Sequence, residues 1–112
     1  MLTLNDLLTP HAAVREVPLK DRPGSVYVRA LPAIEALNLF GSVKTAGDDS
    51  PRLTAIQVAA YLCDASGVPL GTIEQCLSML ATLSQRDVSA ILRAGTEMNR
   101  IDDNAIEGAA KN

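Results

Sequence analysis

Two short β-favouring stretches lie near the start of the chain, at residues 13–19 and 25–30, and a Lys-Asp-Arg-Pro-Gly turn sequence separates them. Apolar and polar residues alternate along the second stretch, which is the period-two pattern of a half-buried strand. Pro18 has no N–H for a ladder hydrogen bond, so the first strand is expected at a sheet edge. The pattern therefore predicts a small β-hairpin near 13–30, preceded by a short helical turn at 3–8.

The pattern changes to a helical period after the hairpin. Pro32 suits the first turn of a helix. Ile34, Leu37 and Phe40 then recur on one face of a helix that we predict at 32–40.

A linker is predicted between this helix and the next. Residues 41–51 contain two glycines, two serines, two adjacent acids and a proline, a composition typical of a flexible, solvent-exposed connection. Ser50 and Pro51 form a helix-start signal, with the serine as cap and the proline at the first helical position. The helix that follows, 51–63, is apolar nearly all round, so it either lies centrally in the core or is covered in part by a partner.

This apolar helix contains the candidate partner-binding residues. A domain of this size has one small core, in which a helix that is apolar on every face cannot hide completely. Val58, Tyr61 and Leu62 are therefore predicted to contribute to self-association or to the binding of a partner protein, with burial in the core as the alternative.

Two amphipathic helices are predicted in the last third of the chain, at 73–82 and 85–99. Thr72 and Gln75 form a capping box at the start of the first. Residues 102–112 lose the helical period and are predicted to be a disordered tail.

Composition agrees with a single domain over residues 1–101. Of the 112 residues 47% are hydrophobic but only 3% are aromatic, so the core must be mainly aliphatic. The predicted fold class is mainly α (α+β), with a small N-terminal β-hairpin followed by a compact bundle of about four helices. No apolar run is long enough to span a membrane, and the N-terminus lacks the cationic start of a signal peptide, so a cytoplasmic protein is expected.

Charge argues against a nucleic-acid-binding protein. Ten basic and thirteen acidic residues give a net charge of −3. Arg86, Arg93 and Arg100 recur every seven residues on one predicted helix, but Asp87 and Glu97 interrupt them. We interpret this stripe as a solvated helix face, because phosphate binding requires a clustered basic surface. A helix-turn-helix DNA-binding or regulatory module, formed by the last two helices, stays the alternative function.

The sequence contains no recognisable catalytic or metal-binding pattern. The single histidine, His11, follows Pro10 in a connector, and no glycine-rich phosphate loop is present. Cys63 and Cys76 occupy apolar positions and are expected as reduced, buried thiols, and together with one histidine they leave a zinc site one ligand short. The protein is therefore predicted not to be an enzyme and to use no cofactor or metal.

Two motifs follow each other in a distinctive order. A Val-Tyr-Val-Arg-Ala-Leu strand at 26–31 leads directly into a helix, and a Leu-Cys-Asp-Ala-Ser-Gly-Val-Pro-Leu turn at 62–70 joins a hydrophobic helix to two amphipathic ones. In this order and spacing the chain resembles the tail assembly chaperone family of long-tailed bacteriophages. The resemblance covers roughly residues 14–101 and departs from the family pattern at 70–72 and 41–51.

This resemblance implies a non-catalytic chaperone of a phage or prophage, working in the cytoplasm of the bacterial host. Such proteins bind the helical tape measure protein while the tail tube polymerises around it, and they are absent from the mature virion. The family also implies the tail tube protein as a partner, through an extension made by programmed frameshift. The codons of Ala110, Lys111 and Asn112 can form the slippery heptamer A-AAA-AAC, on which such a frameshift could occur.

Overall fold

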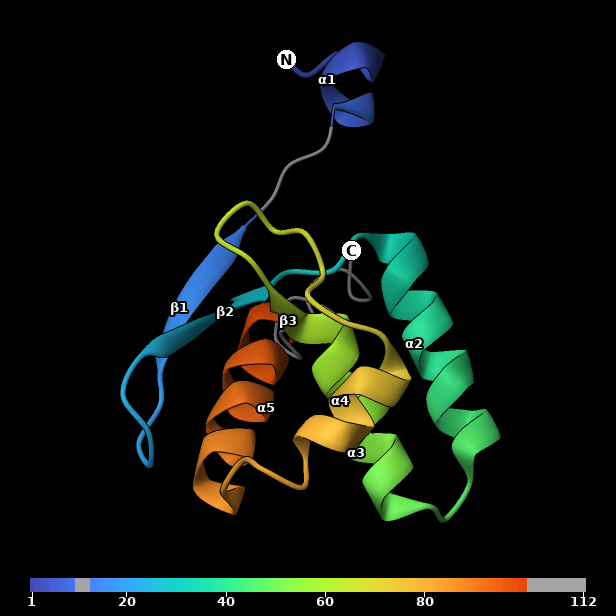
Figure 1. The fold of residues 1–112 in the computed structure, drawn as a ribbon. Coiled ribbons are helices and arrows are strands. Elements are labelled where there is room, and N and C mark those ends of the chain that lie inside the picture. The colour runs from blue at the N-terminus through green and yellow to red at the C-terminus, as the bar shows by residue number, and fades with distance from the viewer. Residues whose placement is uncertain (10–12, 101–112) are drawn as a thin grey trace, which may run out of the picture.

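The computed structural model describes residues 1–9 and 13–100, and in this part of the chain it contains five helices and three strands (Figure 1). It confirms the predicted class, because a small antiparallel hairpin is followed by a helical region. His11 and the predicted tail at 102–112 lie outside the described residues. The elements are, in chain order, α1 (Leu4–Leu8), β1 (Val14–Pro18), β2 (Ser25–Arg29), α2 (Ala33–Ala46), α3 (Ser50–Tyr61), β3 (Leu62–Cys63), α4 (Ile73–Met79) and α5 (Gln85–Asn99).

The strands form one antiparallel sheet in the order β1-β2-β3. β1 is therefore an edge strand, as the proline at its last position predicted. The register of the hairpin runs from Val14 opposite Arg29 to Pro18 opposite Ser25. The sheet thus begins with the predicted hairpin and gains one further strand.

The additional strand, β3, corrects the prediction of a helix at 51–63. The helix ends at Tyr61, where the backbone of Leu62 becomes extended and pairs with Val28 of β2. The local helical period could not reveal this ending, because the strand that pairs with Leu62 lies far earlier in the chain.

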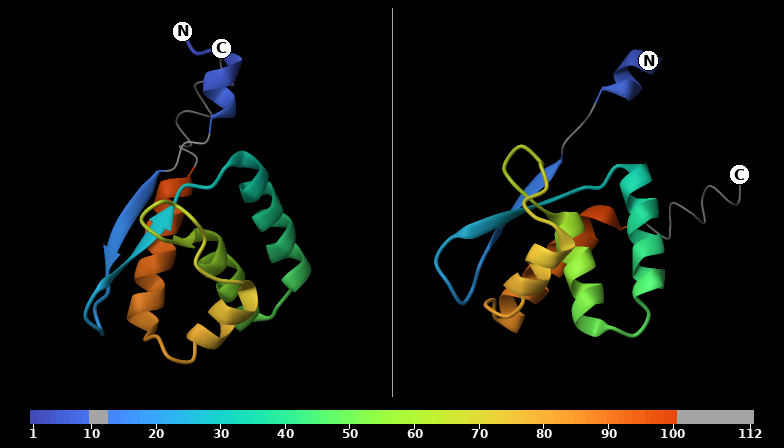
Figure 2. Two further views of the ribbon diagram at one scale, coloured as in Figure 1. Left: turned by 45° about the horizontal axis from the view of Figure 1, so that its top comes forward. Right: turned by 45° about the vertical axis from the view of Figure 1, so that its right-hand side comes forward.

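The core is centred on α3, which packs against α2, α4 and α5, while α5 also packs on β1 and β2. The hairpin and α2 lie on opposite sides of this centre (Figure 2). Gly95 allows α5 to approach α3 closely, because a Cβ at that position would lie 2.3 Å from Cδ2 of Tyr61. The largest fully buried side chains are those of Ile91, Val28, Val58, Asp87 and Cys63.

The predicted linker at 41–51 is much shorter than expected, because α2 continues to Ala46. Leu39, Val43 and Ala46 keep the i, i+4, i+7 spacing of one helix face, and each is half-buried. The helix then stops at Gly47, whose φ of 64° favours glycine. Tertiary packing of this face extends the helix through a sequence whose composition alone resembles a loop.

Of the helix caps predicted at Ser50 and Thr72, one is wrong and one is confirmed. Thr72 and Gln75 form the predicted capping box of α4. A box of the same kind begins α1. In α3 the cap is Asp49 rather than Ser50, since the Asp49 side chain accepts a hydrogen bond from the N–H of Arg52. Local capping chemistry thus determines where these helices begin.

Candidate protein-binding surface

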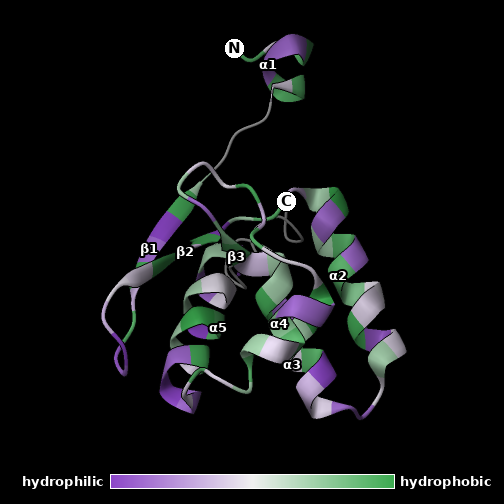
Figure 3. Ribbon diagram, in the orientation of Figure 1, coloured by the Kyte–Doolittle hydropathy of each residue, from purple (hydrophilic) through white to green (hydrophobic). Residues whose placement is uncertain are grey.

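The outer face of α2 carries an exposed row of apolar side chains. Ile34, Leu37 and Phe40 are 65%, 70% and 66% exposed, and we call these three residues the α2 stripe. α2 contains no buried residue, although Figure 3 shows that several of its residues are hydrophobic. Large apolar side chains grouped on one exposed helix face are typical of protein-binding surfaces.

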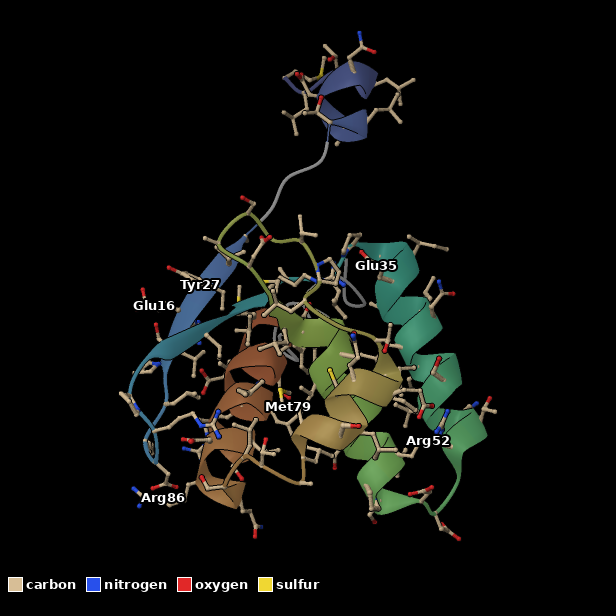
Figure 4. The ribbon with its side chains drawn as sticks, viewed as in Figure 1. Glu16, Tyr27, Glu35, Arg52, Met79 and Arg86 are labelled. Atoms are coloured by element: carbon tan, nitrogen blue, oxygen red, sulfur yellow. The ribbon has the colours of Figure 1, made fainter. Side chains whose placement is uncertain are left out.

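A buried arginine anchors α2 to the rest of the domain. The guanidinium of Arg29, on β2, donates two hydrogen bonds to the Glu35 carboxylate, at 3.0 Å and 2.8 Å, and its Nε donates to the carbonyl of Ala60 at 2.9 Å. The hydrogen bonds from Arg29 hold the pKa of Glu35 below its ordinary value of 4.5. This fork connects the first turn of α2, where Glu35 lies (Figure 4), to the sheet and to α3.

The C-terminal end of the α2 stripe carries a positive charge. The Lys44 ammonium lies 5.3 Å from the centroid of the Phe40 ring, a cation–π distance. Gly41 lies one turn after Leu37, and a Cβ there would have nothing within 4 Å. The C-terminal end of the stripe therefore has open space at Gly41 and a cation at Lys44, features that suit an approaching helix with apolar and acidic side chains.

A second group of exposed apolar side chains belongs to the N-terminal helix. Leu4, Leu7 and Leu8 of α1 are 70%, 69% and 69% exposed, and we call them the α1 leucines. α1 has no buried residue and stands apart from the rest of the domain (Figure 2). The chain thus presents two separate apolar helix surfaces.

The three residues predicted to bind a partner are core residues instead. Val58 is fully buried, and Tyr61 and Leu62 are only 9% and 5% exposed. All three belong to one cluster with side chains of the sheet and of α5. The alternative that the sequence left open, burial in the core, is therefore the one that the structure adopts. α3 could be apolar all round because its neighbours cover it.

The exposed surface of α2 could have been found only in part from the sequence. The spacing of the α2 stripe was visible as i, i+3, i+6. Which helix lies centrally and which lies at the periphery depends on tertiary contacts, and no local signal reports it.

The first arginine of the α5 stripe contacts the hairpin. Arg86 contacts the carboxylate of Asp21 at 3.4 Å, and the buried Asp87 carboxylate accepts a hydrogen bond from the N–H of Lys20 at 2.6 Å. The hairpin loop therefore lies against the first turn of α5. A DNA-reading helix of a helix-turn-helix module uses that turn to contact base edges, so this packing disfavours the alternative function.

Both cysteines lie in the interior of the domain. Cys63 and Cys76 are free and buried, and burial raises the pKa of both thiols, which makes them poor nucleophiles at neutral pH. Within 1–9 and 13–100 no cluster of three or more His, Cys, Asp or Glu side chains could hold a metal ion. Nor does any helix in this part of the chain have the length and hydrophobicity needed to cross a membrane.

Comparison with protein families, with curated proteins and with solved structures found no match to this chain.

Proposed function

We propose that this protein is a non-catalytic tail assembly chaperone that binds the tape measure protein of a long-tailed phage or prophage. The proposal combines the resemblance of residues 14–101 to that family with one structural observation, the exposure of the α2 stripe. A domain with a complete core leaves a helix face of large apolar side chains open to solvent. Such a face can pack against an apolar stripe of another helix.

The size of the α2 stripe favours weak, repeated binding over one tight site. Complete burial of its three side chains would contribute about 1–2 kcal/mol each, or about 3–6 kcal/mol in total. Association costs at least about 4 kcal/mol in lost freedom of motion. One copy would therefore bind weakly, whereas many copies along a long helical protein could cover it and still be displaced when the tail tube polymerises.

The proposal includes a second partner. A frameshifted extension beyond the shared domain would recruit the tail tube protein, while the α2 stripe holds the tape measure protein. The residues at the predicted slippage site, Ala110, Lys111 and Asn112, lie outside the described part of the chain. The gene sequence tests this part directly. A GCG or GCC codon for Ala110, or an AAG codon for Lys111, with no open overlapping frame beyond Asn112, would contradict it.

Co-expression with the tape measure protein encoded beside its gene tests the main proposal. Wild-type protein should keep the tape measure protein soluble and co-purify with it. Leu37→Asp and Phe40→Asp should each lower the co-purified fraction at least about tenfold, because binding would then bury a carboxylate on the contact face. Leu70→Asp is the matched control, since Leu70 is 55% exposed but lies outside α2.

Two results would contradict the proposal. The first is a tape measure protein that stays insoluble and does not co-purify with the wild-type chain. The second is equal capture by the Leu37→Asp, Phe40→Asp and Leu70→Asp variants, which would separate binding from the α2 stripe.

A further inference from the structure

The exposed apolar surface of this chain is concentrated in two places. Ten large apolar side chains are highly exposed among the described residues, and eight of them belong to residues 1–8 or to α2. The other two, Val68 and Leu70, lie in the loop before α4. Single exposed apolar residues are normal on a protein surface. Two helices that each expose three or more large apolar side chains suggest binding surfaces.

α1 cannot owe its stability to its own length. It has five residues, whereas isolated helices shorter than roughly 12–15 residues are marginal in water. Its sequence nevertheless encodes a helix, because Thr3 and Asp6 form a complete capping box. A helix that is well capped but unpacked would gain stability from a surface that covers the α1 leucines.

The α1 leucines find no such surface on their own chain. Leu7 and Leu8 line the rim of a shallow pocket beside Leu31 and Pro32, yet both stay 69% exposed. The α2 stripe is also uncovered in the single chain. We propose that α1 of one copy packs on the α2 stripe of a second copy, so that the protein self-associates by exchanging its N-terminal helices.

The two surfaces are both short and each places three apolar side chains along one side of a helix. Leu4, Leu7 and Leu8 have the i, i+3, i+4 spacing, and the α2 stripe has the spacing i, i+3, i+6. At about 1.5 Å per residue the α1 leucines span about 6 Å and the stripe about 9 Å, so the leucines fit within its length. The open space at Gly41 gives a leucine room to approach the backbone of α2.

Charge selects an antiparallel arrangement. Asp6 lies in the first turn of α1, and Lys44 lies in the last turn of α2, beyond Phe40. If the helices run in opposite directions, the acidic end of α1 lies beside the basic end of α2, which also aligns the two helix dipoles favourably. A parallel arrangement would place Asp6 near Glu35, a like charge at the first turn of α2.

Reciprocal exchange across a two-fold axis doubles the contact, which can make the dimer stable. One five-residue helix covers little area, but a two-fold dimer forms the same contact twice. Residues 9–13 connect α1 to β1 and can span at most about 18 Å, so each α1 must stay close to its own domain. The two domains would therefore also lie side by side, which adds contact area between them.

The inference uses the same α2 stripe as the proposed function but does not rest on it. If both are correct, α1 of a neighbouring copy and the tape measure helix compete for one surface. The oligomeric state of the purified chain can be measured without any tape measure protein, so either idea can fail alone.

Light scattering after size-exclusion chromatography, combined with mixing of variants, tests the exchange. The wild-type chain should have about twice the monomer mass of 11.8 kDa. A double variant of α1, Leu4→Asp with Leu7→Asp, and a double variant of α2, Leu37→Asp with Phe40→Asp, should each be monomeric and folded. When they are mixed, the intact α1 of one can use the intact α2 stripe of the other. Only one of the two contacts then forms, so a 1:1 complex of twice the mass should appear at a higher concentration than the wild-type dimer needs.

Several outcomes would overturn the proposal. The first is a wild-type chain that stays monomeric at its highest soluble concentration. The second is an α1 double variant that remains dimeric, which would place the interface elsewhere. If each double variant is monomeric but the mixture forms no complex even at its highest soluble concentration, the exchange is wrong even though both helices matter. Leu70→Asp is the control that should keep the wild-type mass.

Discussion

α2 and α3 follow each other in the chain and have similar lengths, 14 and 12 residues, yet they use their apolar side chains in opposite ways. α3 has four buried residues and packs against three other helices. α2 has no buried residue, packs against α3 and presents Ile34, Leu37 and Phe40 to solvent. The number of neighbours around a helix, more than its own hydrophobicity, decides whether an apolar side chain belongs to the core or to a binding surface.

The two helices are also held by different kinds of interaction. α3 is fixed by close packing, as at Gly95, which leaves no room for a Cβ against Tyr61. α2 packs against α3 through a half-buried face, and the Arg29 fork on Glu35 adds a polar anchor at its first turn. A peripheral helix with a polar anchor can tolerate changes on its outer face, which is what a binding surface requires.

The strongest test of this difference between α2 and α3 is to introduce the same kind of substitution in each helix. Val58→Asp would bury an unpaired carboxylate in the core, at a cost of at least about 4 kcal/mol, close to the whole stability of a marginal domain. Leu37→Asp changes an exposed side chain and should shift the unfolding free energy by less than about 0.5 kcal/mol. Urea unfolding followed by circular dichroism measures both, under conditions where the proteins are monomeric. A folded Val58→Asp protein or an unfolded Leu37→Asp protein would contradict the assignment.

Truncation of core side chains tests the packing around α3 at a smaller scale. Ile91→Ala on α5 should cost about 2–5 kcal/mol, since Ile91 is fully buried and the cavity would not collapse completely. Leu77→Ala on α4 should lie at the lower end of that range, because Leu77 is only half-buried. Denaturation midpoints equal to the wild-type value for both variants would remove these residues from the core.

Removal of the polar anchor of α2 should have a smaller effect than truncation of the core, and the pH dependence of that effect identifies the anchor. Arg29 lowers the folded-state pKa of Glu35, so the pair stabilises the protein above the unfolded pKa, near 4.5, and this contribution is lost as pH falls through the folded value. Because Glu35 is partly exposed, Glu35→Gln should cost only about 0.5–1 kcal/mol at neutral pH. The difference from wild type should shrink as the solution becomes more acidic than pH 4.5. A difference that is independent of pH would show that the carboxylate charge plays no part in anchoring α2.

Much of the local structure was readable from the sequence. The alternating pattern at 25–30 and the turn before it predicted the hairpin, and Pro18 predicted that its first strand lies at an edge. The capping box at Thr72 predicted the start of α4. These features follow from backbone hydrogen bonding and conformational preference within a few residues, so neighbouring residues suffice to specify them.

The sequence by itself thus determined the fold class, the hairpin and most helix starts, whereas tertiary structure alone decided which apolar faces are covered. Val58, Tyr61 and Leu62 were candidates for binding on hydrophobicity, but they lie in the core because helices and strands from distant parts of the chain surround α3. The continuation of α2 to Ala46 and the pairing of Leu62 with Val28 have the same origin. Burial depends on which distant segments pack together, and a local pattern reports the presence of an apolar face but not the partner that covers it.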